Sequence, residues 1–163
     1  MKESLGVKVE IDLRDKDLCL GPFVEDVEYH AFPIPSGTES TRFEKFENEY
    51  KQIFGLIANA YEAPVYLHCN HGADRTGIVV FMLLTVCGAS VENIARDYMF
   101  TNFSVYGSRV STFKTDFLKW RSKLEKLDGD TLAEKAKTWL ISKGISDETV
   151  EIIRATFVEN YQA

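Results

Sequence analysis

The stretch PVYLHCNHGADRTGIVVFMLL, residues Pro64–Leu84, contains a short apolar run, a polar loop and a longer apolar run. The first run, Pro64–His68, predicts a buried strand, and Ile78–Leu84, apolar almost all round, predicts a buried helix that stops at Gly88. Ligands of open α/β sheets bind beyond the carboxyl ends of the strands, where a following helix also presents its free N–H groups. The loop between the two runs is therefore the predicted site of chemistry.

Two further strands and a helix are predicted upstream. Val7–Leu13 alternates apolar and polar side chains, and the weaker strand Val27–Phe32 ends in the predicted loop Pro33–Ser40. Thr41 and Glu44 have capping-box spacing and predict the start of an amphipathic helix. The apolar face of that helix is formed by Phe43, Phe46, Tyr50, Ile53, Phe54 and Ile57.

The second half of the chain is predicted to be helical. The order of elements favours an α/β fold with a mostly parallel central sheet flanked by helices and a helical C-terminal half. One domain over residues 1–163 is expected from the length. The predicted C-terminal helices lie near Val91–Thr101, Arg109–Leu127, Leu132–Lys143 and Asp147–Tyr161, with Gly144 as a C-terminal cap.

Composition excludes several functions. The 163 residues are 45% hydrophobic and 27% charged, with a net charge of -6, which argues against general nucleic-acid binding but leaves room for a small positive pocket. No apolar run reaches the roughly 18 residues of a membrane span. The start lacks a secretory signal, which predicts a cytoplasmic protein, or a secreted one if a leader was removed. Cys19, Cys69 and Cys87 are a poor disulfide framework and predict a free thiol.

Cys69 and Arg75 are the residues of the loop that point to chemistry. Gly72 and Gly77 are expected to relax the backbone, so that successive N–H groups form an anion nest. A helix N-terminus and a neighbouring arginine lower the pKa of a thiol, and a thiolate is a strong nucleophile near neutral pH. The planar guanidinium of Arg75 matches two phosphoryl oxygens. The spacing therefore predicts that both side chains face one tetrahedral anion.

Supporting roles follow for the neighbours. Thr76 is placed to hydrogen-bond the sulfur, and His68 is expected to orient the loop from behind. The residues predicted to bind the substrate phosphate are Asn70, His71, Gly72, Ala73, Arg75 and Thr76.

Less reactive interpretations exist for the same residues. A cysteine at the end of a strand is often an inert small hydrophobe, and an isolated arginine is more often a surface ion pair. His68 and His71 beside Cys69 could suggest zinc, but no second cluster with ligand spacing is present, so no metal is predicted.

The pattern His68-Cys69, five residues, Arg75-Thr76-Gly77 resembles the signature of the cysteine-based protein tyrosine phosphatase superfamily, in its bacterial tyrosine/serine phosphatase branch. Leu5–Arg14, Ala95–Asn102 and Leu140–Ser146 resemble further segments of that branch. The resemblance implies a phosphocysteine mechanism at a phosphate-binding P-loop, without metal or other cofactor. It also implies that the partner is a phosphotyrosine protein or a small phosphomonoester.

The resemblance further implies a general acid. Many members of the superfamily supply an Asp about 30 residues before the cysteine, but here that region is Ile34–Glu39 and Glu39 is its only carboxylate. In the branch that this chain resembles, the Asp before the loop arginine is the better candidate, which assigns the role to Asp74. The alternative for Asp74 is a charge that stabilises the helix N-terminus.

Two departures keep other functions open. Some relatives carry Lys in place of Ala73, a residue linked to phosphoinositide use, although protonated His71 could restore positive charge. The branch also has a segment before its leading strand that is missing ahead of Val7. The alternatives to a phosphatase are a catalytically weak phosphate-binding module and a rhodanese-like sulfur transferase. A phosphoinositide or inositol phosphate phosphatase, the physiological substrate and the oligomeric state also stay open.

Overall fold

The structure is a computed structural model that describes residues 5–36, 43–60, 63–103 and 116–158. It divides into two compact units, Met1–Thr76 and Gly77–Ala163, and the boundary between them falls inside a helix. The expectation of one domain over residues 1–163 therefore stays a prediction. In the part of the chain that the structure describes, no helix is both long and apolar enough to cross a membrane.

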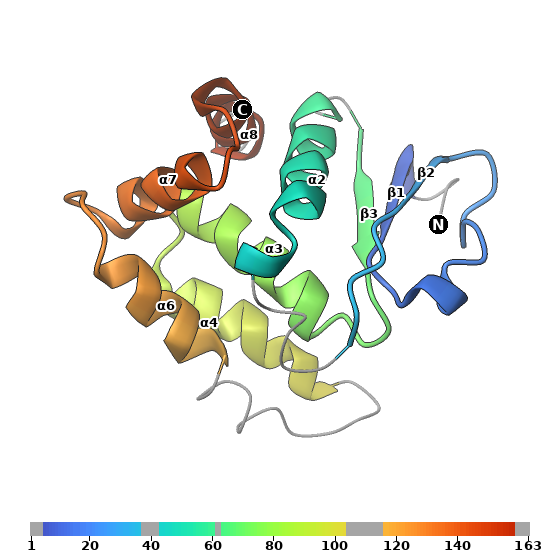
Figure 1. Cartoon of the computed structure of the whole chain (residues 1–163), viewed down its shortest axis with the longest axis horizontal. Helices are drawn as coiled ribbons and strands as arrows, with labels where there is room; N and C mark the ends of the chain where they lie inside the picture. Colours follow the sequence, from blue (N-terminus) through green and yellow to red (C-terminus); the bar gives the residue numbers. More distant parts are fainter. Residues whose placement is uncertain (1–4, 37–42, 61–62, 104–115, 159–163) are drawn as a thin grey trace. The chain divides into compact units, whose positions relative to one another are not determined.

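The first unit contains a three-stranded parallel sheet with the order β2-β1-β3 (Figure 1). In register, Asp12 at the end of β1 is level with His68 of β3 and with Ala31 of β2. The ladder continues one step further, where Leu13 N–H donates to His68 O at 2.9 Å. All three strands therefore end at one edge of the sheet, which brings together the segments that follow them. The strands are β1 (Val9–Asp12), β2 (Glu28–Ala31) and β3 (Val65–His68).

Strand β1 is buried at all four positions, although half of them are acidic. Because side chains alternate along a strand, Val9 and Ile11 occupy one face and Glu10 and Asp12 the other. Both carboxylates are fully buried. The sheet thus has an apolar face and a polar one, and the polar face contains carboxylates that must be paired.

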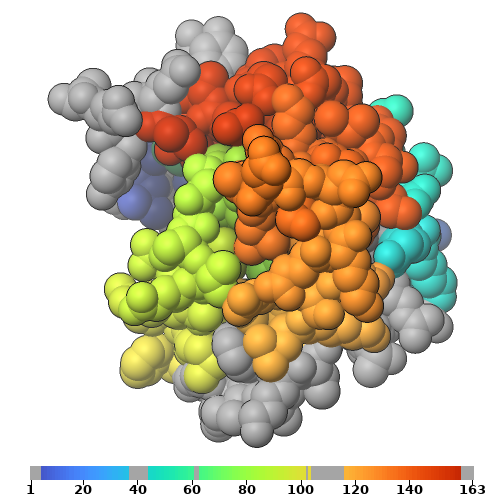
Figure 2. All heavy atoms as spheres, turned by 90° about the vertical axis from the view of Figure 1, so that its left-hand side faces the viewer, coloured from blue at the N-terminus to red at the C-terminus, as the bar shows by residue number. Residues whose placement is uncertain are grey.

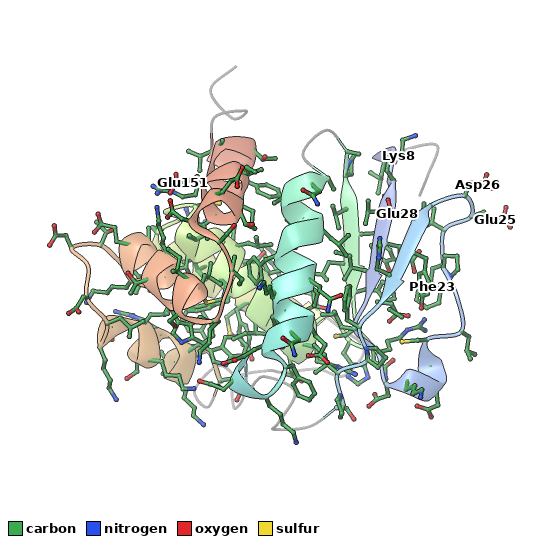
Figure 3. All side chains as sticks on the ribbon, turned by 45° about the horizontal axis from the view of Figure 1, so that its top comes forward. Lys8, Phe23, Glu25, Asp26, Glu28 and Glu151 are labelled. Carbon is green, nitrogen blue, oxygen red and sulfur yellow. The ribbon has the colours of Figure 1, made fainter. Side chains whose placement is uncertain are left out.

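Helix α2 (Glu47–Asn59) lies beside β3 in Figures 1 and 3 and buries Tyr50 and Phe54 completely. The helix expected from Thr41 onward was predicted to begin too early. A 3₁₀ turn, η2 (Phe43–Lys45), comes first, and α2 has Phe46 at its N-cap without a side-chain cap. Glu44 therefore does not cap α2, and Thr41 lies outside the described residues.

The second unit consists of helices, as the periodicity predicts. Helix α6 packs beside α7, and α7 beside α8; Figure 2 shows α6 and α7 side by side on one face. Gly144 has a φ of 82°, which confirms it as a C-terminal cap. The part of the predicted helix Arg109–Leu127 before residue 116 lies outside the described residues. The helical elements are α3 (Asp74–Val86), α4 (Val91–Met99), η3 (Phe100–Phe103), α6 (Leu118–Glu125), α7 (Leu132–Ser142) and α8 (Asp147–Val158).

Four aromatic rings form the centre of the second unit. Phe81 of α3 packs edge-on to Phe117 at 5.5 Å between ring centroids, and Tyr98 of α4 packs against the same ring at 5.7 Å. Trp120 of α6 lies against both Phe81 and Tyr98. All four residues are at least nine-tenths buried, so this cluster fixes three helices to one another.

Candidate active site

Cys69 comes directly after the last residue of β3 and is 9% exposed. Burial raises the pKa of its thiol, but four other influences outweigh burial and hold the pKa below its usual value. They are the side chain and N–H of Thr76, the N–H of His71, and the charge of Arg75. The loop therefore favours the thiolate form of Cys69.

Thr76 contributes its hydroxyl to this balance. Its Oγ1 is buried, and the hydroxyl lowers the pKa of the Cys69 thiol. The proton of a hydroxyl can rotate about the C–O bond, and leaving a buried donor without a partner costs about 1–3 kcal/mol. We therefore infer that the Thr76 hydroxyl donates to Cys69 Sγ.

The two glycines of the loop have different roles. Gly72 has a φ of 64°, a conformation that other residues adopt only under strain, so it does relax the backbone as expected. Gly77 lies within α3 at an ordinary negative φ, so the expected backbone role is wrong for this residue. A Cβ at Gly77 would lie 3.7 Å from the ring of Tyr98, an ordinary contact.

Arg75, in the first turn of α3, is 5% exposed and is held through a single nitrogen. Its Nη1 donates to Leu13 O at 3.2 Å and to Ile34 O at 2.8 Å, the carbonyls just past β1 and β2. Nη1 also donates to Asp15 Oδ2 at 3.1 Å. Within the described residues, Nη2 and Nε have no such bonds. One edge of the guanidinium is thus anchored to the sheet, and the other remains available for an anion.

Asp15 is a residue of this site that the sequence did not indicate. Its Oδ1 accepts from the N–H of Ser36 at 3.0 Å while Oδ2 accepts from Arg75. The bond from Ser36, together with that from Arg75, holds the pKa of the Asp15 carboxyl below its usual value despite partial burial. Asp15 and Arg75 are 60 residues apart, so only the shared edge of the parallel sheet brings them together.

His68 directly precedes Cys69 and is hydrogen-bonded to the central strand. Its Nε2 is 3.0 Å from Glu10 Oε1, and both residues are buried. Glu10 also accepts hydrogen bonds from the N–H groups of Phe23 and Val24. A carboxylate with both oxygens engaged by amides holds His68 as a donor through Nε2. The Nδ1 atom has no hydrogen-bond partner within the described residues, and Asp12 Oδ1 is 3.9 Å away.

Asp12 is fully paired on the same face of the sheet. The Arg14 side chain forms a fork to both of its oxygens, at 2.9 Å and 2.7 Å, and the Tyr29 hydroxyl donates to Oδ2 at 2.8 Å. The guanidinium of Arg14 in turn lies 4.2 Å above the ring of Phe23, which Figure 3 shows beside the sheet. Asp12 is therefore engaged in holding the strand ends together.

The other residues expected in the site fall into two groups. Asp74 is the first residue of α3 and is half-buried, and Ala73 before it is buried. Asn70 and His71 are exposed on the loop. Glu39, the rival general acid, lies outside the described residues. The described residues contain no group of three or more His, Cys, Asp or Glu side chains that could hold a metal ion.

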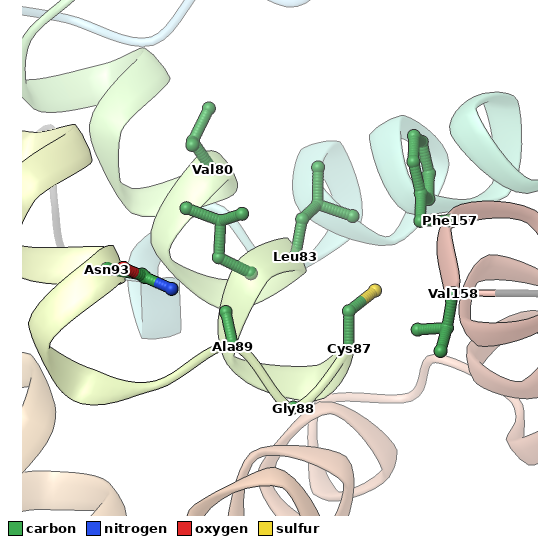
Figure 4. Close-up of a pocket in the computed structure, with 9 residues that line it drawn as sticks. Val80, Leu83, Cys87, Gly88, Ala89, Asn93, Phe157 and Val158 are labelled. Atoms are coloured by element: carbon green, nitrogen blue, oxygen red, sulfur yellow. The ribbon is translucent and has the colours of Figure 1, made fainter. Parts of the chain in front are cut away.

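The three cysteines are free and differ in their surroundings. Burial raises the pKa of Cys87, which lines an apolar pocket of about 690 Å³ in the second unit with Val80, Leu83 and Phe157 (Figure 4). Burial also raises the pKa of Cys19, with the charge of Asp12 adding to the effect. Of the three thiols, Cys69 is thus the one whose surroundings favour the ionised form.

A thiol with a lowered pKa and an arginine lie close together in sequence at the edge where a parallel sheet ends, an arrangement that can hold an anion beside a thiolate. The chain belongs to the tyrosine phosphatase family, whose model matches residues 1–161. The α/β fold with a parallel sheet, predicted from the sequence, is confirmed.

Three curated proteins illustrate the similarity. A tyrosine-protein phosphatase of Nostoc commune is 29% identical over 58% of this chain and 40% of its own length. The tyrosine-protein phosphatase-like protein OCA2 of Saccharomyces cerevisiae is 28% identical over 60% of this chain and 51% of its own. The triple specificity protein phosphatase PtpB of Mycobacterium tuberculosis is 33% identical over 48% and 25%, respectively. The matches thus span about half or less of these relatives.

Proposed function

We propose that this chain hydrolyses phosphomonoesters, with phosphotyrosine in proteins as the substrate class, through a phosphocysteine at Cys69. The observation that carries the proposal is the lowered pKa of the Cys69 thiol, stabilised by Thr76, an amide of the loop and Arg75. The half-buried thiols of Cys19 and Cys87, by contrast, have their pKa raised, with burial as the largest cause. Membership of the tyrosine phosphatase family and the names of the three relatives support the same reaction.

The proposed reaction has two steps. In the first, Cys69 Sγ attacks phosphorus, the P–O bond to the leaving group breaks, and Asp74 gives its proton to the leaving oxygen. In the second, water attacks phosphorus, the S–P bond breaks, and the Asp74 carboxylate takes a proton from the water. Inorganic phosphate leaves, and the thiolate is regenerated.

Arg75 and the loop amides act on the phosphoryl oxygens in both steps. The Nη2 and Nε edge of Arg75, which has no partner in the described part of the chain, is the edge that would bind two oxygens. The loop Asn70–Thr76 supplies N–H groups around the same anion. In the second step, the hydroxyl of Thr76 stabilises the departing sulfur, which lowers the barrier to hydrolysis of the intermediate.

Turnover of para-nitrophenyl phosphate by the wild type and Cys69→Ser tests the proposal. The expected result is hydrolysis that Cys69→Ser abolishes, and a phosphorylated Cys69 peptide after acid quench. Binding of phosphate without turnover would instead identify a phosphate-binding module. Sulfur transfer from thiosulfate without phosphatase activity would identify a rhodanese-like enzyme. A phosphotyrosine peptide assayed beside a phosphoserine peptide and a phosphoinositide then assigns the substrate class.

A further inference from the structure

We propose that Asp15 is a positioning residue that sets the orientation of the Arg75 guanidinium, and with it the strength of phosphate binding in the transition state. The inference rests on the proposed function, because it assigns the phosphate-binding edge of Arg75. It adds a residue outside the loop Cys69–Thr76, on the segment that follows the central strand.

The first support is the use that Asp15 makes of its side chain. Asp15 is the N-cap of the turn η1 (Lys16–Leu18), where an aspartate usually accepts hydrogen bonds from the N–H groups of its own helix. Asp15 makes no such bond, and both of its oxygens bind distant groups instead, Ser36 N–H and Arg75 Nη1. The Asp15 side chain thus does not cap its own turn. It makes two longer-range contacts instead, which join three segments of the first unit.

The second support is the geometry at Arg75. Three acceptors share the two hydrogens of Nη1: the carbonyls of Leu13 and Ile34, which are neutral, and the carboxylate of Asp15. The Asp15 carboxylate adds a charged acceptor at 3.1 Å, and charge-assisted hydrogen bonds are roughly twice as strong as neutral ones. The guanidinium is therefore fixed on its Nη1 side before substrate arrives.

The third support is that Asp15 is a poor general acid. Its pKa is held below the usual range by Ser36 and Arg75, so it carries no proton near neutral pH. The Asp15 side chain is 28% exposed to water, and the cation that it contacts is Arg75. The role that fits these contacts is orientation of Arg75.

Asp15→Asn keeps the size of the side chain and one good acceptor, so it can satisfy Ser36 or Arg75 but not both. Because two carbonyls still hold Nη1, we expect a loss of about tenfold in kcat/KM for para-nitrophenyl phosphate, well short of the full loss caused by removing Arg75. Small misplacements of a catalytic group can cost up to about 100-fold. The loss should appear in kcat and in inhibition by vanadate, which resembles the transition state, more than in inhibition by inorganic phosphate.

Asp17→Asn is the matched control, because Asp17 is an exposed aspartate two residues away on η1. It should keep kcat/KM, and both variants should be compared by urea unfolding. The proposal would be overturned if Asp15→Asn and wild type had equal kcat/KM. It would also be overturned if the variant weakened inhibition by vanadate and inhibition by inorganic phosphate equally. If the wild type shows no Cys69-dependent turnover, the proposed function fails by itself. Calorimetric titration with vanadate then still tests Asp15, since Asp15→Asn must bind it more weakly than Asp17→Asn.

Discussion

Glu10 Oε1 lies 3.0 Å from His68 Nε2, in a pair that joins the central strand to the residue before Cys69. The same carboxylate accepts hydrogen bonds from the N–H groups of Phe23 and Val24. One buried side chain therefore contacts both the residue before Cys69 and the segment that leads to β2. Both oxygens of Glu10 accept and neither donates, which makes the charge and shape of a carboxylate necessary at this position.

Glu10→Gln should therefore destabilise the protein by about 2–3 kcal/mol, because the new NH₂ group faces N–H donors and leaves buried groups unpaired. The measurement is the urea unfolding midpoint. Glu28→Gln is the control, since the Glu28 side chain is 65% exposed where it pairs with His30, and exposed pairs contribute roughly 1 kcal/mol or less. Equal midpoints for the two variants would show that Glu10 is not a required acceptor.

Iodoacetate should alkylate Cys69 faster than Cys19 or Cys87 at pH 6. The pKa of Cys69 is lowered, while burial raises the pKa of the other two, and each unit of difference in pKa changes the thiolate fraction about tenfold. Peptide mass mapping of the quenched protein gives the three rates in one experiment. Added inorganic phosphate should protect Cys69 alone. Similar rates at all three sites would remove the thiolate from the proposed mechanism.

Asp74→Asn should slow hydrolysis of alkyl phosphates more than hydrolysis of aryl phosphates, whose leaving groups need a proton less. The comparison of kcat/KM for a series of leaving groups, with the pH profile of each, measures this dependence. A general-acid role for Asp74 also predicts that kcat/KM of the variant depends less on pH than that of the wild type. Small and equal losses across the series would leave Asp74 as a charge at the start of α3.

The elements themselves follow from local pattern, and the contacts between them do not. The alternation in Val7–Leu13, the apolar run before Cys69 and the spacing in α7 and α8 each specify an element within a few residues. The placement of β1 between β2 and β3 depends on which strands pair. Glu10 illustrates the limit, because alternation separates it from Ile11 but does not say that residues near Phe23 will bury it.

The site shows the same division. Cys69, Arg75 and Thr76 are recognisable together because they fall within eight consecutive residues, Cys69–Thr76. Asp15 and the carbonyl of Ile34 reach Arg75 from 60 and 41 residues away, across strands whose order the sequence does not state. The sequence pattern predicts that Gly77 relaxes the backbone of the loop, but α3 has already begun at Asp74. The helix makes its backbone ordinary.

The ionisation of Asp12 makes the free energy of unfolding depend on pH in the acid range. Burial raises the pKa of Asp12, but hydrogen bonds from Arg14 and Tyr29 outweigh burial and hold it below the usual value. A carboxyl whose folded pKa is lowered adds stability above its unfolded pKa of about 3.9, and this contribution disappears as pH falls through the folded pKa. Asp12→Asn should cost about 3 kcal/mol at pH 7, because it leaves Arg14 without its partner. The difference from wild type should shrink below pH 4 in urea unfolding, and a constant difference down to pH 2 would contradict this account.

Gly72→Ala and Gly77→Ala should have opposite effects on stability. Alanine at Gly72 must adopt a positive φ and should cost about 1 kcal/mol or more. Alanine at Gly77 lies in a helix with room for its Cβ and should gain about 0.5–1 kcal/mol. Thermal unfolding of the pair measures both effects. A destabilised Gly77→Ala would mean that the approach of Tyr98 is closer than 3.7 Å in solution.

Glu10 binds both the segment around Phe23 and His68, the residue before Cys69. The amide proton of Phe23 exchanges with solvent only when its bond to Glu10 opens, and the ring of Phe23 packs against that of His68 at 4.9 Å between centroids. Deuterium uptake at the Phe23 amide would then report how often the contacts around His68 open. A partner that pulls residues 22–24 away from β1 would therefore also remove a ring that packs against His68, the residue next to Cys69.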